Sequence, residues 1–188
     1  MDRIRPIKYK VDWTKIPYTK LLENMEVFRL SDDDIRKSRP DLTDKELKDF
    51  KNKGGTGSGW NQNSYSKIVR VANQNLNSYP ELEKIFTNFG YGCMDYISFV
   101  ELPAGTGYPP HRDAYRSCNI NFIMPNGSMP IAPLILNGNV YNYDRFVFDP
   151  QYEHEVPAVN TTRFTMMLTY TTASFEKITG LLKRDGWM

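Results

Sequence analysis

The chain has 188 residues, 40% of them hydrophobic and 13% aromatic, so it is long enough to bury one good core and short for two domains. Its 24 basic and 22 acidic side chains leave a net charge of +2, which gives no support for binding to nucleic acid or to a membrane surface. No apolar run is long enough to span a bilayer, and two cysteines in a chain of this size are expected to stay reduced. A cytoplasmic protein is therefore expected.

The first ninety residues are expected to form mainly helices. Thr43 and Glu46 stand three residues apart in the pattern of a capping box, which predicts that a helix begins there. Apolar residues at helical spacing predict another helix over residues 64–76. A third is expected between Pro80, a favoured first-turn residue, and Gly90. Because each helix has one apolar face, each needs a sheet to cover.

From Tyr91 onward the hydrophobic pattern repeats every second residue, which is the period of a β-strand. The predicted strands, with one earlier segment, are Val27–Leu30, Tyr96–Leu102, Cys118–Met124, Pro130–Leu136, Asn139–Tyr143, Phe146–Phe148, His154–Ala158 and Arg163–Thr171. So many short strands indicate a sandwich or barrel, and a jelly roll is the member of that class that brings distant strands together. Ser174 is expected to cap a final helix.

These elements predict a single domain that is mainly β, with the N-terminal helices packed on the outer face of the main sheet. Within it, residues 1–90 form a helical support region, 91–173 the β core and 174–188 the C-terminal helix. Side chains alternate between the two faces of a strand, and in two of the predicted strands one face is polar and the other apolar. The polar faces carry Asn119, Asn121, Arg163 and Thr165. A barrel with a polar pocket inside and helices over an apolar outer surface would produce this pattern.

Both histidines of the chain stand where the ligands of a mononuclear iron site would stand. His111 and Asp113 are two residues apart at a predicted strand end, so their side chains point the same way. His154 would complete the set from another strand. Two imidazoles and one carboxylate on one face of the metal, with the other positions open, is the ligand set of non-haem Fe(II) oxygenases.

Together with Arg163, this motif resembles the signature of the 2-oxoglutarate- and Fe(II)-dependent dioxygenases, whose fold is a double-stranded β-helix with supporting helices. Two segments are most similar to the hypoxia-type prolyl hydroxylases, namely Gly105-Thr-Gly-Tyr-x-x-His-x-Asp113 and His154-Glu-Val followed by Thr162-Arg163. Phe148-Asp149 and Glu153–Val156 are also similar to the aspartyl/asparaginyl hydroxylases. The resemblance spans residues 95–171.

The resemblance implies three cofactors or co-substrates: Fe(II), 2-oxoglutarate and O2. His111, Asp113 and His154 would hold the iron. Arg163 would bind the distal carboxylate of 2-oxoglutarate with its guanidinium fork, a geometry that lysine cannot supply, and Thr165 would donate a hydroxyl from the same face.

The pattern departs from the prolyl hydroxylases at one strand position. Where those enzymes place a tyrosine for 2-oxoglutarate, the sequence is expected to place Met124, and Asn119 or Asn121 is the candidate substitute. Tyr108, Arg112 and Arg116 lie where substrates of the family enter, and they are the candidates for substrate contact. The alternative for these three is a solvated basic rim.

The expected function is hydroxylation of a C–H bond in a protein side chain, prolyl residues included, or in a small molecule, with succinate and CO2 as co-products. The carboxylate of Asp113 argues for hydroxylation, because related halogenases lack it. One alternative is a nucleobase-modifying oxygenase, which would need a basic, aromatic groove that a net charge of +2 does not indicate. Another is a non-catalytic, cupin-like metal-binding protein, against which Arg163 argues, since a bare metal site needs no neighbouring buried cation.

Overall fold

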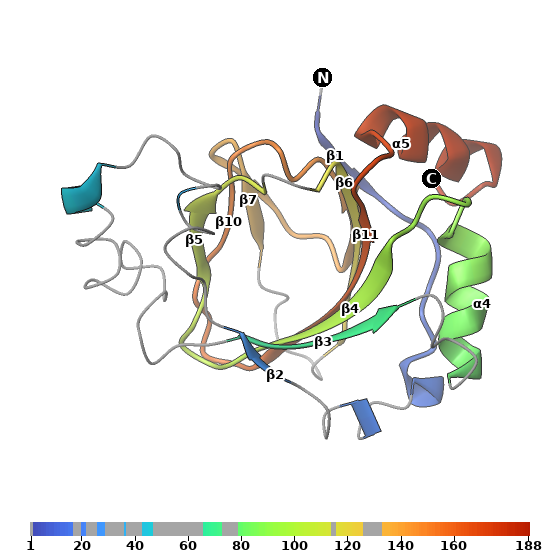
Figure 1. The fold of residues 1–188 in the computed structure, drawn as a ribbon, viewed down its shortest axis with the longest axis horizontal. Coiled ribbons are helices and arrows are strands. Elements are labelled where there is room, and N and C mark those ends of the chain that lie inside the picture. Colours follow the sequence, from blue (N-terminus) through green and yellow to red (C-terminus); the bar gives the residue numbers. More distant parts are fainter. Residues whose placement is uncertain are drawn as a thin grey trace.

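Two antiparallel β-sheets face each other across an interior (Figure 1). The larger sheet has seven strands in the order β1-β9-β6-β11-β4-β3-β2, and the smaller has four in the order β5-β10-β7-β8. The strands are β1 (Ile4–Pro6), β2 (Glu26–Phe28), β3 (Ser66–Ala72), β4 (Tyr96–Leu102), β5 (Tyr108–His111), β6 (Cys118–Ile123), β7 (Leu134–Leu136), β8 (Asn139–Tyr141), β9 (Arg145–Phe148), β10 (His154–Val156) and β11 (Arg163–Tyr170). The structure is a computed structural model, and it describes residues 2–16, 20–21, 26–28, 36, 43–46, 66–72, 79–113, 116–125 and 133–188.

Helices α4 (Pro80–Phe89) and α5 (Phe175–Arg184) lie on the outer side of the larger sheet (Figure 1). A short 3-10 helix, η1 (Trp13–Lys15), belongs to the N-terminal segment. No helix among the described residues has the length and apolar character needed to cross a membrane.

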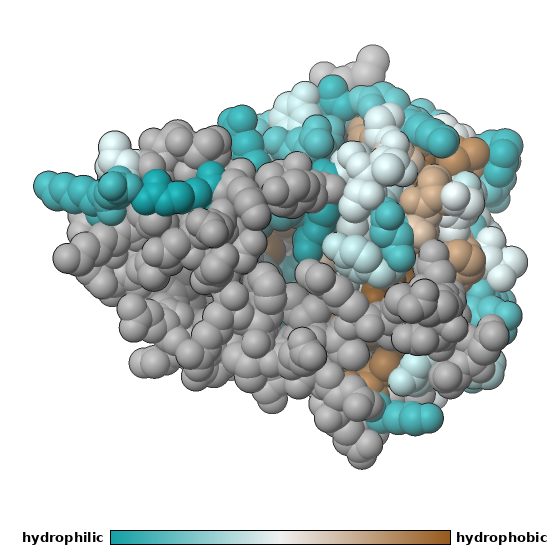
Figure 2. Space-filling model, viewed as in Figure 1, coloured by the Kyte–Doolittle hydropathy of each residue, from teal (hydrophilic) through white to brown (hydrophobic). Residues whose placement is uncertain are grey.

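The outer face of the larger sheet forms the main apolar core with these helices. Leu82, Ile85 and Phe89 of α4 pack in one cluster with outward-facing strand residues such as Phe99 and Phe122. Burying one large apolar side chain completely contributes about 1.5–3 kcal/mol, so this cluster dominates the stability of the sheet. The space-filling view shows hydrophobic surface gathered on the side of these helices, between hydrophilic residues (Figure 2).

The inner face of the larger sheet forms a second, smaller apolar cluster with the other sheet. The members from the larger sheet are Ile4, Leu102, Ile123, Phe146 and Phe148, and those from the smaller sheet are Leu134, Leu136 and Val156. The predicted polar residues Asn119, Asn121, Arg163 and Thr165 also lie on this inner face, since they occupy paired positions in the β4-β11-β6 register. The predicted polar residues therefore do face the interior and the outer surface is apolar, but the interior is mixed rather than polar, because it also contains the apolar cluster.

Most of the predicted elements are confirmed. The seven strands expected after Tyr91 appear as β4 and β6 to β11, with bounds that differ by a few residues at some ends. The helix between Pro80 and Gly90 is α4, and Ser174 caps α5 by accepting a hydrogen bond from the backbone N of Lys177 at 3.2 Å. Thr43 and Glu46 form the expected capping box, but most of the helix that would follow lies outside the described residues.

The helix expected over residues 64–76 is wrong, because this segment contains β3. Three β-branched residues, Ile68, Val69 and Val71, favour a strand, and pairing with β2 on one side and β4 on the other overrides the helical spacing. The region before residue 90 therefore contributes three strands to the larger sheet. The placement of the other helices expected before Pro80 stays a prediction.

Two short strands lie outside the strand ranges predicted from the sequence, although His111 was expected at a strand end, and both contain proline. β1 ends in Pro6, and β5 contains Pro109 and Pro110. Proline removes a backbone donor and argues against a strand, except at the edge of a sheet. Both strands occupy an edge, β1 of the larger sheet and β5 of the smaller.

Candidate metal centre

His111, Asp113 and His154 form one cluster, in which one possible ligand atom from each lies within 4.8 Å of the others. β10 pairs with β5 so that His154 stands directly opposite His111, and the two ring centroids are 4.2 Å apart. β5 ends at His111, which brings Asp113 back to the same side, and Asp113 Oδ1 lies 3.9 Å from His111 Nε2. The pairing of these two strands thus brings together residues that are far apart in the sequence.

One backbone hydrogen bond orients His154. Its Nδ1 lies 2.9 Å from the carbonyl oxygen of Tyr152, and since a carbonyl can only accept, Nδ1 carries the hydrogen. Nε2 is then the nitrogen with a free lone pair, as a metal-ligating imidazole requires. Burial, reinforced by the electrostatic effect of the neighbouring His111, lowers the pKa of His154 to about 3 against the opposing effect of Asp113. His154 is therefore neutral at physiological pH.

Asp113 is ionised and held from two sides. Its backbone N donates to the carbonyl oxygen of Pro150 at 2.9 Å, and its Oδ2 accepts from Nη1 of Arg116 at 3.2 Å. Burial acts to raise the pKa of Asp113, but the charge of Arg116, helped by the electrostatic effect of the neighbouring His154 and His111, outweighs burial and holds that pKa below its usual value.

Arg163 begins β11 on the inner face, opposite Leu102, and only 6% of it is exposed. Burial lowers the pKa of Arg163 to about 10, and the phenol of Tyr108 acts in the opposite direction. Nε of Arg163 donates to Thr165 Oγ1 at 3.4 Å, a long hydrogen bond. The structure therefore brings Arg163 and Thr165 together, as expected from their shared face.

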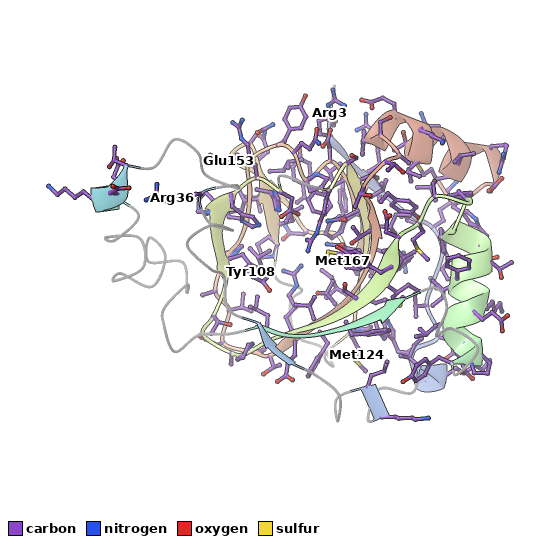
Figure 3. All side chains as sticks on the ribbon, viewed as in Figure 1. Arg3, Arg36, Tyr108, Met124, Glu153 and Met167 are labelled. Carbon is purple, nitrogen blue, oxygen red and sulfur yellow. The ribbon has the colours of Figure 1, made fainter. Side chains whose placement is uncertain are left out.

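Tyr108, a candidate for substrate contact, lies deeper than the solvated rim that was its alternative. Its ring packs with the inner apolar cluster and points into the interior from β5, as does Met167 from β11 (Figure 3). The ring centroid of Tyr108 is 6.1 Å from that of His111. Tyr108 is thus near His111, and its phenol acts electrostatically on Arg163.

The two arginines proposed as substrate contacts, with a solvated rim as the alternative, differ in position. Arg112 is exposed, in agreement with a solvated rim. Arg116 is not on the rim, since its guanidinium is paired with Asp113 and its side chain is only 24% exposed. The sequence pattern contained no signal for that pairing.

Asn119 and Asn121 do not surround Arg163. They stand opposite Thr169 and Met167, which at about 3.3 Å per residue lie roughly 20 and 13 Å from Arg163 along β11. The β6 position nearest Arg163 on this face is Ile123, opposite Thr165.

Met124, which the sequence was expected to place at the tyrosine position of the prolyl hydroxylases, does not face the interior. The backbone N of Met124 donates to the carbonyl oxygen of Phe164 at 2.9 Å, which continues the register one residue beyond Ile123. Met124 therefore shares the outer face with Phe164, because neighbouring side chains alternate.

A row of buried polar groups lies on the inner face of the larger sheet. Some of these groups were not predicted from the sequence. Within the described residues, no hydrogen-bond partner is within reach of Ser98 Oγ, Asn121 Oδ1, Thr169 Oγ1 or the amide of Asn119. The register places all four around Met167 and Thr169. Alternation along Tyr96–Leu102 was the signal that could have added Ser98 to the polar face.

No family model matches the chain, and no curated protein matches it in sequence. Among solved structures, it resembles a prolyl hydroxylase from Trichoplax adhaerens in complex with a hypoxia inducible factor oxygen degradation domain peptide fragment. That similarity has a TM-score of 0.54 and 15% identity, and it covers 95% of this chain and 85% of the other. It shows that the two proteins share a fold.

Two other solved structures resemble parts of the chain. A Pseudomonas putida prolyl-4-hydroxylase matches with a TM-score of 0.40 and 18% identity over 56% of this chain and 71% of its own. An oxidoreductase of the 2OG-Fe(II) oxygenase family from Burkholderia pseudomallei matches with a TM-score of 0.41 and 12% identity over 58% of this chain and 69% of its own. The match to the Trichoplax adhaerens enzyme, together with the two antiparallel sheets, confirms the fold expected from the sequence resemblance.

Proposed function

We propose that this protein is an Fe(II)- and 2-oxoglutarate-dependent dioxygenase that hydroxylates a C–H bond. The observation that carries the proposal is that a cluster of two histidines and one aspartate shares an interior with a buried arginine. The donor set fits Fe(II), because imidazole nitrogens and a carboxylate that leave positions open are the ligands this ion takes in oxygenases. His154 is neutral and Asp113 is ionised, as ligands must be.

Arg163 fits the distal carboxylate of 2-oxoglutarate. A lowered pKa means that the interior disfavours the charged guanidinium, and a bound carboxylate would offset that cost. A guanidinium also presents two parallel donors to a carboxylate, which fixes its orientation. Thr165 would add a hydroxyl donor from the same face.

Iron, 2-oxoglutarate and O2 together supply the oxidant for C–H hydroxylation, with succinate and CO2 as co-products. The residues of this chain would bind the reactants and hold the metal ligands in position. The carbonyl of Tyr152 fixes the ring of His154, Arg116 holds Asp113, and the inner apolar cluster around Phe148 limits the entry of water.

A protein or peptide segment is the substrate class we propose first, with prolyl residues among its targets, and a small molecule is the alternative. Support comes from the Trichoplax adhaerens enzyme, which shares the fold and was solved with a peptide fragment. Similarity of the segment from Gly105 to Asp113 to the prolyl hydroxylases points the same way. A single domain and a cytoplasmic location remain predictions.

The test is oxygen-dependent formation of succinate from 2-oxoglutarate by Fe(II)-loaded protein, first alone and then with a panel of prolyl peptides and small molecules. The wild type is expected to form succinate slowly without substrate and faster with a substrate. His154→Ala is expected to reduce the rate to background, whereas Lys177→Ala, at an exposed position on α5 that has no proposed role in the site, is the control. Equal rates in the wild type and His154→Ala would contradict the proposal.

A further inference from the structure

Arg116 is held in the interior by three separate groups. Its Nη1 lies 3.2 Å from Asp113 Oδ2 and 3.7 Å from the sulfur of Met167. The side chain of Arg116 also forms a hydrogen bond with Tyr96. Met167 and Tyr96 come from adjacent strands, β11 and β4, so the guanidinium is anchored to the larger sheet while it pairs with the loop after β5.

We propose that Arg116 is a positioning residue that restricts Asp113 to a single metal-binding oxygen. The inference rests on the metal site of the proposed function. It adds a role for a residue that the sequence placed among the substrate contacts.

The two oxygens of Asp113 have different surroundings. Oδ1 lies 3.9 Å from His111 Nε2, on the side of the histidine cluster, whereas Oδ2 accepts the hydrogen bond from Arg116. A charge-assisted hydrogen bond from a guanidinium is among the strong ones in proteins. Rotation of the carboxylate to present both oxygens to a metal would break that bond, so Arg116 favours binding through Oδ1 alone.

The consequence concerns the number of open positions at the metal. A six-coordinate ion held by three single-atom ligands keeps roughly three positions open, and a two-oxygen bond from Asp113 would remove one of them. The proposed reaction needs all three, two for 2-oxoglutarate and one for O2. Arg116 therefore preserves a coordination position without touching the metal or the substrate.

Arg112 provides a matched comparison in the same segment. It lies one residue from each of His111 and Asp113, carries the same charge, and is exposed. A general effect of positive charge near the metal would appear at both arginines, but a restraint on Asp113 Oδ2 would appear only at Arg116.

The experiment counts exchangeable water on bound Mn(II) by water-proton relaxation, without 2-oxoglutarate, so that no turnover is involved. The wild type and Arg112→Met are expected to show about three exchangeable waters. Arg116→Met is expected to show about one fewer, because the released carboxylate binds through both oxygens. Arg116→Lys, which keeps a charged donor, is expected to recover part of the wild-type count.

Folding is followed for each variant by circular dichroism, and Arg116→Gln is a second variant in which a neutral, shorter side chain replaces the guanidinium. An unchanged water count in whichever of Arg116→Met and Arg116→Gln folds would overturn the inference while leaving the metal site intact. A wild type that binds no Mn(II) would overturn the metal site, and this inference with it.

Discussion

His154 donates its Nδ1 hydrogen to the carbonyl oxygen of Tyr152 across 2.9 Å. The same turn between β9 and β10 also supplies the carbonyl of Pro150, which accepts from the backbone N of Asp113 at 2.9 Å. Two of the three clustered side chains are therefore oriented by one short turn. Arg3 supports that turn, since its guanidinium lies 3.5 Å from Asp149 Oδ2 and over the ring of Tyr152.

Metal-free protein is expected to lose stability as the pH falls, because His154 is buried in its neutral form. Its pKa is about 3 in the folded protein and 6.5 unfolded, so the unfolded state binds the proton more readily. The contribution to stability is complete above about pH 6.5 and is lost progressively towards pH 3. At pH 5 the loss relative to pH 7 should be about 2 kcal/mol.

The measurement is urea unfolding of metal-free protein at pH 7, 6 and 5. His154→Gln should flatten this part of the curve, and Arg112→Gln should leave it unchanged. Identical pH dependence in the wild type and His154→Gln would show that another group is responsible.

Arg163 is expected to lower the free energy of unfolding of the metal-free wild type. Below about pH 10 the guanidinium is charged in both the folded and unfolded states, so at neutral pH the folded protein bears the full cost of burying it. A shift from 12.5 to about 10 corresponds to roughly 3 kcal/mol. Arg163→Met should therefore raise the free energy of unfolding by up to about 3 kcal/mol.

Urea unfolding at pH 7.5 without metal checks this prediction. The matched control is Arg112→Met, which removes an exposed arginine and should change stability by less than about 0.5 kcal/mol. If Arg163→Met were less stable than Arg112→Met, the buried charge would be stabilising in the free protein.

Tyr170 joins β11 to α4, since its hydroxyl donates to the carbonyl oxygen of Phe89 at 2.6 Å in a buried setting. Tyr170→Phe keeps the ring but removes the donor and should cost about 1–3 kcal/mol. Amide hydrogen exchange should accelerate most in the last turn of α4. Tyr141→Phe, at a half-buried position on the smaller sheet, is the control, and an equal cost in both variants would argue against this contact between sheet and helix.

The β part of the fold could be predicted because its signal is local. Alternation along residues 163–171 separates Arg163 and Thr165 from Met166 and Leu168, and the structure places the two groups on opposite faces. The spacing of His111 and Asp113 is equally local, which is why these residues could be proposed as ligands from the sequence.

What could not be predicted depends on register and on distant partners. The apolar residues within 66–72 are spaced as in a helix, yet pairing with β4 makes this segment a strand. Asn119 shares the polar face with Arg163, but only the strand register shows that the two are far apart along the sheet. The pairing of Arg116 with Asp113 likewise depends on anchors that β4 and β11 supply.

The most direct test of the account is the affinity for 2-oxoglutarate measured anaerobically with Mn(II) in place of iron, for the wild type, Arg163→Ala and Arg163→Lys. Truncating a buried, hydrogen-bonded charge costs roughly 2 to 5 kcal/mol, and 1.4 kcal/mol is about ten-fold in affinity. Arg163→Ala should therefore bind 2-oxoglutarate at least about ten-fold more weakly, with Arg163→Lys intermediate and Mn(II) affinity unchanged in both. Equal affinity in all three proteins, or no binding of 2-oxoglutarate by the wild type, would contradict the assignment.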